Sequence, residues 1–510
     1  MSENGQFRGT LRATIEDVEP DRTICRGARL ARDARFDGKF FIGVRTTGIF
    51  CRPVCPAPSP KEENVQYYAT AAACVEAGLR PCLRCRPESS PGTPAWLGTS
   101  TTVSRALRLI GEGALEEHGV DALAARLGIG SRHLRRLFLE HLGATPVAVA
   151  ETRRLLSAKK LIDETTLPLT RIAIASGYGS IRRFNAAFRA SYGRSPRELR
   201  RERGAAPKAG SCTLLLRFRP PYDYGALLEF FRRRAIPGVE CVVRDTYRRT
   251  FLMAGRPGWL EIRPDGANTL TLQVEYAGSS ELLHIAARAR RMFDLDADPL
   301  PVHDVLRADP LLRKLVAARP GVRVPGAWDG FELGVRAILG QQVSVAGAST
   351  LSGRLVEKFG LPAPFSVEGL THTFPAADEL ASADLAIGIP AARAEAIRAF
   401  AGAVAAGELA FHGAVDTTEL MQRLCAIRGI GPWTAQYIAM RALSDPDAFP
   451  AGDLALLRAA GEKTAAAMER RAESWRPWRA YAAMHIWQGG NDDRLHMDGK
   501  PHGKAAAGGG

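Results

Sequence analysis

Two closely spaced pairs of cysteines near the amino terminus place the tightest constraint on how this chain folds. The pairs are Cys51-x3-Cys55 and Cys82-x2-Cys85, with 26 residues between them. Two such pairs brought together by a loop form a tetrahedral four-thiolate site, and thiolates favour zinc over hard cations. The sequence therefore predicts one zinc ion bound by these four cysteines. The alternatives are free or redox-active thiols, or a zinc ion that only holds a small domain together.

Length and charge indicate a multidomain protein with a polyanionic partner. The chain of 510 residues has room for three or four domains. Its formal net charge is +15 and its pI about 9.7. Residues 101–203 hold 19 Lys and Arg against 10 Asp and Glu, so +9 of the excess lies in this segment. Such concentration favours nucleic acid over an acidic small molecule.

The sequence also predicts where the protein works. No apolar run is long enough to span a bilayer, and the polar start lacks a signal-peptide core. We therefore expect a cytoplasmic protein without a membrane partner, whose cysteines are thiols or metal ligands rather than disulfides. Five cysteines without paired spacing are expected to be small buried residues, namely Cys25, Cys74, Cys212, Cys241 and Cys425.

The residues around the cysteine quartet carry a more specific signal. Residues 41–55 (FIGVRTTGIFCRPVC), 63–68 (ENVQYY) and 78–85 (GLRPCLRC) resemble the amino-terminal domain of the Ada family of methylation sensors. This resemblance implies that Cys51 accepts a methyl group from a DNA methyl phosphotriester, while Cys55, Cys82 and Cys85 complete the zinc site. Methylation would then change the formal charge of the cluster from about −2 to about −1 and raise its affinity for DNA phosphates.

The basic residues beside the quartet have two possible roles. Arg52, Arg84 and Arg86 either contact DNA phosphates or offset the charge of the thiolates. Pro58 stands where the Ada pattern usually has another basic residue, so that phosphate contact is in doubt.

A helical pattern is repeated after a Pro-, Ser- and Gly-rich linker at residues 87–102. Each copy has a capping residue, a glycine break, a serine cap and a closing glycine; these are Asp121, Gly128, Ser131 and Gly143, then Thr170, Gly177, Ser180 and Gly193. The two serines are 49 residues apart. Two helix-turn-helix units joined by a helix are therefore predicted, with reading helices that enter successive major-groove faces.

The stretch through residues 195–199 (SPREL) resembles the AraC-type DNA-binding domain. Ada-family sensors carry such a domain at this point, so the resemblance implies promoter DNA as a partner and leaves RNA polymerase open as a second. Candidate DNA contacts are the polar residues of the two reading helices: Arg132, His133, Arg135 and Arg136, then Arg182, Arg183 and Asn185. Each either reads a base or meets only phosphate or solvent.

The carboxyl-terminal half begins with strands and becomes helical. Residues 212–218, 241–247 and 269–276 read as strands, residues 224–234 as a helix, and helical patterns continue from about residue 280. Residues 331–345 (FELGVRAILGQQVSV) form an apolar helix followed by a break. In residues 424–437 (LCAIRGIGPWTAQY), Gly429 and Gly431 form a turn between two helices, where outward N–H groups and a helix dipole suit a DNA phosphate.

Further motifs in this half resemble the AlkA family of alkylpurine DNA glycosylases. They are residues 220–223 (PPYD), 319–323 (RPGVR) and 475–487 (WRPWRAYAAMHIW), and the likeness runs from about residue 212 to residue 488. It implies that the glycine turn is a helix-hairpin-helix and that Asp453 stabilises the cationic sugar of the transition state. It also implies an aromatic pocket for a flipped, cationic base, lined by Phe230, Trp433, Tyr437 and Trp487.

Three details refine the glycosylase prediction. Trp433 stands where bifunctional glycosylases have a lysine, so strand cleavage is not expected. Gln342 stands where AlkA-like proteins present a leucine wedge to the duplex. Carbonyls around Gly429 leave open a bound monovalent cation. No Pro-Cys-His-Arg motif of an O6-methylguanine methyltransferase is present.

We therefore predict a multidomain α+β protein and a monomer. Its expected parts are a zinc-bound Ada-type domain (20–90), an all-α double helix-turn-helix domain (100–203), an antiparallel β/α subdomain of AlkA type (211–285), a helical helix-hairpin-helix glycosylase domain (286–490) and a disordered tail (491–510). The predicted activities on double-stranded DNA are methyl transfer to Cys51 and monofunctional excision of alkylated purines such as 3-methyladenine. The alternatives are a regulator with a non-catalytic damage-binding module, and a zinc-stabilised DNA scaffold.

Overall fold

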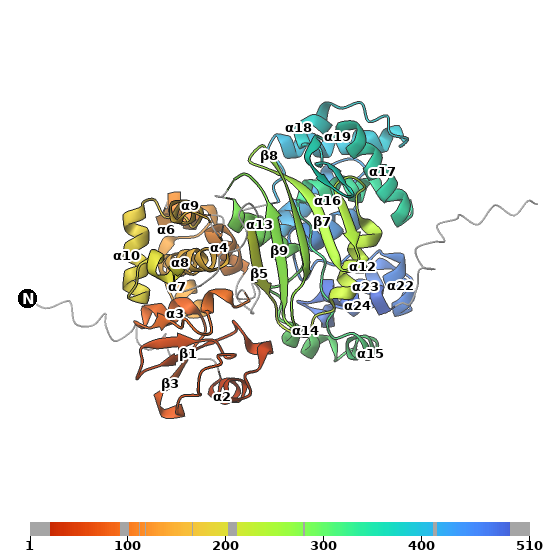
Figure 1. The fold of residues 1–510 in the computed structure, drawn as a ribbon. Coiled ribbons are helices and arrows are strands. Elements are labelled where there is room, and N and C mark those ends of the chain that lie inside the picture. Colours follow the sequence, from red (N-terminus) through yellow and green to blue (C-terminus); the bar gives the residue numbers. More distant parts are fainter. Residues whose placement is uncertain are drawn as a thin grey trace, which may run out of the picture. The chain divides into compact units, whose positions relative to one another are not determined.

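The computed structural model describes residues 21–91, 101–201 apart from 112, 118 and 166, 212–278, 281–411 and 416–489. The chain divides into two compact units. The first consists of Met1–Tyr224, Arg244–Pro301 and His412–Asp416, and the second of Gly225–Val243, Val302–Phe411 and Thr417–Gly510. Figure 1 labels the helices and strands along the chain. Residues 92–100 of the predicted linker and the predicted tail at 491–510 lie outside the described residues. The predicted domain boundaries stay predictions.

A small mixed sheet forms the amino-terminal module of the first unit. Its strands lie in the order β3-β1-β2-β4, where β1 pairs antiparallel with β2 and β3, and β4 pairs parallel with β2. One face packs Ile42, Val44 and Tyr67, and the other packs Phe41 and Phe50. The elements are α2 (Arg22–Ala31), β1 (Phe41–Val44), β2 (Ile49–Cys51), β3 (Val65–Tyr68), α3 (Ala71–Glu76), β4 (Arg80–Pro81) and the 3-10 turn η4 (Pro87–Ser89).

Eight helices follow in the described residues of 101–201. They are α4 (Thr101–Gly111), α5 (Ala114–Glu117), α6 (Gly119–Arg126), α7 (Ser131–Leu142), α8 (Pro146–Glu164), α9 (Leu169–Ala175), α10 (Ile181–Tyr192) and α11 (Pro196–Arg201). The reading helices α7 and α10 bury Leu134 and Phe138, then Phe184 and Phe188. Both end at a left-handed glycine, as predicted for Gly143 and Gly193.

Three of the predicted helix caps are wrong. Asp121 and Thr170 lie inside α6 and α9, because α6 already begins at Gly119 and Pro168 occupies the cap position of α9. Ser131 is the first residue of α7, and Gly130 takes its cap position without a side-chain hydrogen bond. Ser180 is a true cap, since its side chain accepts a hydrogen bond from the Arg183 N–H.

Hydrogen bonds hold the amino-terminal module against the helical domain of the same unit. The Thr70 hydroxyl donates to the Leu142 carbonyl oxygen (2.8 Å), and the Thr145 hydroxyl donates to Oε1 of Glu76 (3.0 Å). The end of the reading helix α7 and the start of α8 are therefore both fixed to α3.

An antiparallel sheet completes the first unit, with β5, β9, β8 and β7 side by side in this order. Leu214 lies opposite Leu272 and Leu216 opposite Leu270, so the apolar side chains of β5 and β9 share the buried face. The elements are β5 (Cys212–Arg217), β7 (Thr246–Met253), β8 (Arg256–Pro264), β9 (Thr269–Glu275) and α13 (Leu282–Met292), and α14 (Pro299–Leu306) spans the division between the units.

The single strand predicted at 241–247 is two strands. β6 (Glu240–Val243) ends where Arg244 adopts a φ of 55°, and β7 starts at Thr246. The prediction missed β8, and it missed the hairpin of β10 (Pro362–Val367) and β11 (Leu370–His372) in the helical half.

The second unit is mainly helical. Its core helix α16 (Gly330–Leu339) packs against α19 and α21, and α20 packs against α21. The helices are α12 (Tyr224–Arg234), α15 (Pro310–Ala318), α17 (Val345–Phe359), α18 (Ala377–Ser382), α19 (Ala391–Ala405), α20 (Thr417–Ala426), α21 (Pro432–Ala442), α22 (Leu454–Ala460), α23 (Ala465–Ala472) and α24 (Arg479–Gly489). Among the described residues, no helix has the length and apolar character that crossing a bilayer requires.

The two equivalent serines of the repeat offer a test of the capping assignment. We expect Ser180→Ala to lower the free energy of unfolding by about 1 kcal/mol, because it removes the N-cap of α10. Ser131→Ala serves as the control and should have a much smaller effect. Denaturant unfolding, with hydrogen exchange followed in α7 and α10, measures both; equal losses would contradict the assignment.

Candidate functional site

The four predicted zinc ligands converge at one end of the amino-terminal sheet. Cys51 is the last residue of β2, and Cys82 follows β4, which runs parallel beside it. All four sulfur atoms lie within 4.8 Å of one another. Zn–S bonds of about 2.3 Å in a tetrahedron separate sulfurs by about 3.8 Å, so the quartet fits a zinc ion.

The four sulfurs lie close enough to perturb one another's protonation. Hydrogen bonding with Cys51 lowers the pKa of Cys55 to about 7, while hydrogen bonding with Cys55 raises the pKa of Cys51. A metal ion binds such sulfurs as thiolates, so metal binding releases their protons.

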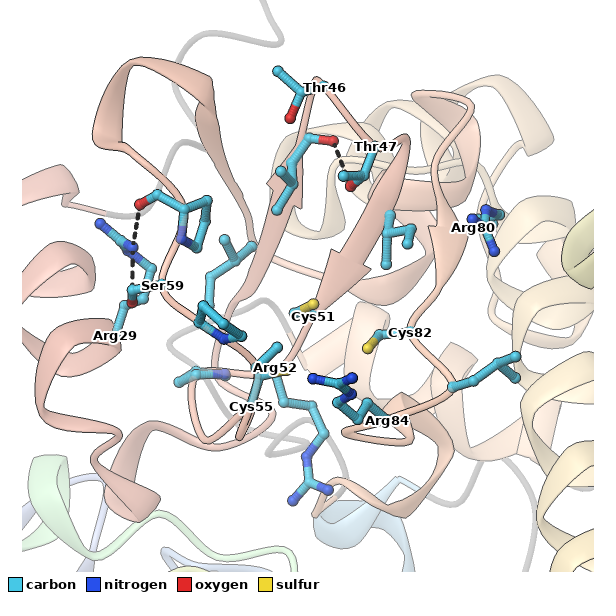
Figure 2. Close-up of a pocket in the computed structure, with 18 residues that line it drawn as sticks. Arg29, Thr46, Thr47, Cys51, Arg52, Cys55, Ser59, Arg80, Cys82 and Arg84 are labelled. Atoms are coloured by element: carbon cyan, nitrogen blue, oxygen red, sulfur yellow. Dashed lines mark hydrogen bonds between the residues drawn. The ribbon is translucent and has the colours of Figure 1, made fainter. Parts of the chain in front are cut away.

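The quartet is unequally accessible. Cys82 and Cys85 are buried, whereas Cys51 and Cys55 are half-buried. A cavity of about 470 Å³ opens onto the site, and Cys51, Cys55, Cys82 and Arg84 are among the residues that line it (Figure 2). Arg80 and Arg84 line the same cavity and are exposed, so a phosphate that enters it meets two cations.

The structure separates the roles of the three neighbouring arginines. Arg52 is buried, and its guanidinium binds both carboxylate oxygens of Asp37. Arg86 forms ion pairs with Glu88 (3.2 Å) and Asp163 (2.9 Å). Both therefore pair with carboxylates of the protein, and of the three only Arg84 is an exposed cation at the cavity. Pro58 also lines this cavity.

The second predicted centre, in the second unit, surrounds Asp453. This residue is the N-cap of α22, and its Oδ1 accepts hydrogen bonds from the backbone N–H groups of Ala455 (3.0 Å) and Leu456 (3.1 Å). Nε1 of Trp487 donates to Oδ1 (3.0 Å), and Nε1 of Trp433 donates to Oδ2 (3.1 Å). Four donors thus fix the carboxylate, and two of them belong to predicted pocket aromatics.

The other pocket aromatics extend from this carboxylate. The rings of Trp433 and Tyr437 stack at 5.3 Å with an interplanar angle of 8°. Nη1 of Arg441 donates to the Tyr437 hydroxyl (2.6 Å), and its guanidinium lies 4.8 Å from the centre of the Phe230 ring. The five predicted residues are therefore linked through direct contacts and Arg441.

The sequence did not reveal the cations behind this pocket. The Arg234 guanidinium lies 3.9 Å from the centre of the Phe230 ring. Burial alone would raise the pKa of Tyr437, but the charges of Arg441 and Arg234 outweigh burial and lower it. No periodicity marks these arginines, because only the fold brings α12 and α21 together. Two of the predicted pocket rings, Phe230 and Tyr437, therefore already lie against guanidinium cations.

The predicted hairpin turn lies between α20 and α21. Gly429 has a φ of 95°, and a Cβ there would lie 2.9 Å from Cβ of Ala396. A Cβ at Gly431 would meet no atom within 4 Å. Nε2 of Gln341 donates to the Gly429 carbonyl oxygen (2.8 Å), one of the carbonyls left open for a monovalent cation. The exposed Gln342 has a φ of 57°.

The predicted DNA-reading side chains point away from the helical core. The positions opposite the buried faces of α7 and α10 are exposed, and they carry Arg132, His133, Arg135 and Arg136, then Arg182 and Arg183. Asn185 is half-buried, and Arg136 forms a hydrogen bond with His133 (3.1 Å). Their roles in DNA contact remain predictions.

Comparisons with known proteins agree with this arrangement. The metal binding domain of Ada matches residues 24–88, a helix-turn-helix domain matches 123–202, and the AlkA N-terminal domain matches 213–329. A probable bifunctional transcriptional activator/DNA repair enzyme AlkA of Mycobacterium tuberculosis is 41% identical over 92% of this chain and 97% of its own length.

Two relatives from Escherichia coli cover different parts. DNA-3-methyladenine glycosylase 2 is 37% identical over 53% of this chain and 95% of its own length. The bifunctional transcriptional activator/DNA repair enzyme Ada is 44% identical over 23% of this chain and 32% of its own length.

This chain belongs to the bifunctional Ada/AlkA family. The membership confirms the predicted fold class, which joins an Ada zinc domain, an AraC-type helix-turn-helix region and a glycosylase fold. It also confirms one zinc site, because the four converging cysteines lie within the matched metal binding domain.

Among the remaining cysteines of this Ada/AlkA protein, Cys25 and Cys74 are buried as predicted. The prediction is wrong for Cys425, which is exposed because it lies on the outward face of α20. Cys212 and Cys241 are only half-buried.

The two hairpin glycines allow a matched comparison. Gly429→Ala should lower the free energy of unfolding by on the order of 1–3 kcal/mol, because alanine is strained at this φ and its Cβ meets Ala396. Gly431→Ala should fold normally and weaken binding to double-stranded DNA several-fold, because the added methyl faces the space expected to hold a phosphate. Denaturant unfolding and fluorescence anisotropy measure the two effects, and equal destabilisation by both variants would contradict this assignment.

Proposed function

We propose that this chain repairs alkylated DNA by two chemistries and uses the first to control binding to promoter DNA. The proposal depends most on one observation: the four cysteine sulfurs converge beside a cavity with two exposed arginines. The relatives named for transcriptional activation, DNA repair and DNA-3-methyladenine glycosylase support it. We further propose that the domains span residues 20–90, 100–203, 211–285 and 286–490, and that the protein acts on DNA as a monomer.

The first chemistry is methyl transfer to Cys51. Zinc bound by the quartet keeps the sulfurs as thiolates at neutral pH. Arg80 and Arg84 bind the backbone of the damaged strand at the cavity, and half-buried Cys51 faces the methyl carbon. The sulfur lone pair forms the S–CH3 bond while the CH3–O bond breaks, and the phosphate leaves as a diester anion. Each chain reacts once because the thioether is stable.

The second chemistry is hydrolysis of the bond between an alkylated purine and its sugar. The electrons of the breaking bond pass to the cationic base, which leaves neutral, and positive charge develops at the anomeric carbon. The Asp453 carboxylate stabilises this charge, and water adds to the sugar and loses a proton to solvent. Trp433 and Trp487 orient the carboxylate through their indole N–H groups. With Trp433 in place of a lysine, we propose that the strand is not cleaved.

Substitution of Asp453 separates catalysis from mere damage binding. Asp453→Asn keeps a side chain that caps α22 as well as aspartate does, so the fold should be retained. We expect the rate of 3-methyladenine release to fall by on the order of 100-fold or more, because the charge that stabilises the transition state is lost. A free-base release assay on alkylated DNA measures this rate. Equal and negligible release by both proteins would instead support a non-catalytic binding module.

Exposure to DNA that contains methyl phosphotriesters tests the first chemistry. We expect intact-mass analysis to show a gain of one methyl group per chain, and peptide mapping to place it on Cys51. The methylated protein should bind promoter DNA on the order of tenfold more tightly at low salt, because one negative charge facing phosphates is removed. A zinc-stabilised scaffold predicts no mass gain, and equal affinities before and after methylation would rule out the charge switch.

A further inference from the structure

A buried chain of contacts connects the methyl-acceptor site with the region that matches AlkA. It begins at Arg52, which directly follows Cys51. Arg52 is only 3% exposed. The Arg52 backbone N–H donates to Sγ of Cys85 (3.4 Å), and its Nη1 donates to the Cys85 carbonyl oxygen (2.8 Å). Arg52 thus holds two of the four ligand residues in position relative to each other.

Asp37 fixes the other side of the Arg52 guanidinium. Nε of Arg52 donates to Oδ1 of Asp37 (2.7 Å), and Nη2 donates to Oδ2. This fork-to-fork pair leaves the arginine little freedom to rotate. Since both side chains are buried, the orientation of Arg52 depends on where the loop at Asp37 lies.

Arg219 lies in the region that matches the AlkA N-terminal domain, and it holds the loop at Asp37. Its Nε donates to the Asp37 carbonyl oxygen (2.9 Å), and its Nη1 donates to the Asp296 carbonyl oxygen (2.7 Å). Arg219 is completely buried. Burying a guanidinium costs several kcal/mol unless its donors are satisfied, so the protein environment must hold both acceptors in place.

The residues after Asp37 are also closely packed. A Cβ on Gly38 would lie 2.4 Å from the Pro91 carbonyl oxygen and 3.1 Å from Nη2 of Arg219. Next to it, Nζ of Lys39 pairs with Oδ2 of Asp298 (2.6 Å), whose side chain is 1% exposed. Residues 37–39 of the amino-terminal module are therefore fixed by Pro91, Arg219 and Asp298, which lie outside this module in the sequence.

We infer that Arg219 is a positioning residue for methyl transfer, acting through Asp37 and Arg52 on the cysteine quartet. The inference deepens the proposed function, since it assumes that Cys51 is the acceptor. Arg219, from the region that matches AlkA, then completes the cysteine site in the region that matches Ada. Without Arg219, the Asp37 loop relaxes, Arg52 loses its orientation, and the hydrogen bonds to Cys85 weaken.

The test compares full-length wild type with Arg219→Met, which keeps an unbranched buried side chain but removes every donor. Arg249→Met is the matched control, because Arg249 is 1% exposed in the same unit and donates to the Thr250 carbonyl oxygen within the sheet. Three quantities are measured: the thiolate-to-metal absorption of the cobalt-substituted protein, the rate of zinc loss to a chelator, and the single-turnover rate of methyl transfer against DNA concentration.

We expect Arg219→Met to shift the cobalt spectrum, and to change both zinc loss and the saturating methyl-transfer rate by about tenfold or more, as for other residues that orient metal ligands. The DNA concentration at half-maximal rate should stay unchanged, and Arg249→Met should behave like wild type in all three measurements. A spectrum and zinc-loss rate in Arg219→Met that match those of Arg249→Met would overturn the inference.

A second variant decides the matter if Arg219→Met does not fold. Asp37→Asn keeps the carbonyl that accepts from Arg219 but weakens the fork to Arg52, and we expect the same spectral shift and faster zinc loss. An unchanged spectrum in Asp37→Asn would also overturn the inference. If wild type accepts no methyl group at Cys51, the proposed function fails, whereas the spectrum and zinc loss still decide whether Arg219 positions the quartet.

Discussion

The geometry of the proposed methyl-acceptor site depends on a buried ion pair between Arg52 and Asp37. Each charge alone would be costly in this interior, so each is stable only while the other is held in place. The pair is directional as well, because the guanidinium also binds the Cys85 carbonyl oxygen. A thiolate cluster that opens onto solvent on one side is thus supported by fixed charges on the other. This explains how Cys51 can be accessible to DNA while the quartet keeps its geometry.

Ion pairs also join the parts of the first unit at the end of α8. Arg86, just after the last zinc ligand, pairs with Asp163, and Glu88 pairs with Lys159 (3.6 Å). At the adjacent positions of α8, Nζ of Lys160 donates to the Leu215 carbonyl oxygen (2.8 Å), and the Leu215 N–H donates to Glu164 (3.1 Å). Helix α8, which lies between the two predicted reading helices in the sequence, therefore contacts both the amino-terminal module and strand β5.

The sequence predicted correctly those features that depend on a few neighbouring residues. Cysteine spacing identified the quartet, and the turn at Gly429 and Gly431 was located correctly because glycine tolerates the positive φ of a turn and proline fixes the φ of a first helical residue. The caps at Asp121 and Thr170 were wrong, since several nearby residues could begin those helices and packing decides among them. The contact between Arg219 and the loop at Asp37 could not be predicted at all: nothing in the sequence relates position 37 to position 219, and only the folded chain brings them together.

Asp453, the carboxylate proposed to act in base excision, shows how one residue can serve structure and chemistry together. Its Oδ1 caps α22 and accepts an indole N–H, so the helix terminus and Trp487 hold the side chain at a fixed rotamer. These hydrogen bonds also lower the energy of the ground state, which by itself would reduce the attraction of the carboxylate for a developing cation. The gain must come from preorganisation: no donor has to reorient as positive charge appears on the sugar, whereas water around a free carboxylate would. A cap that stabilises the helix therefore also removes the reorganisation that would slow the reaction.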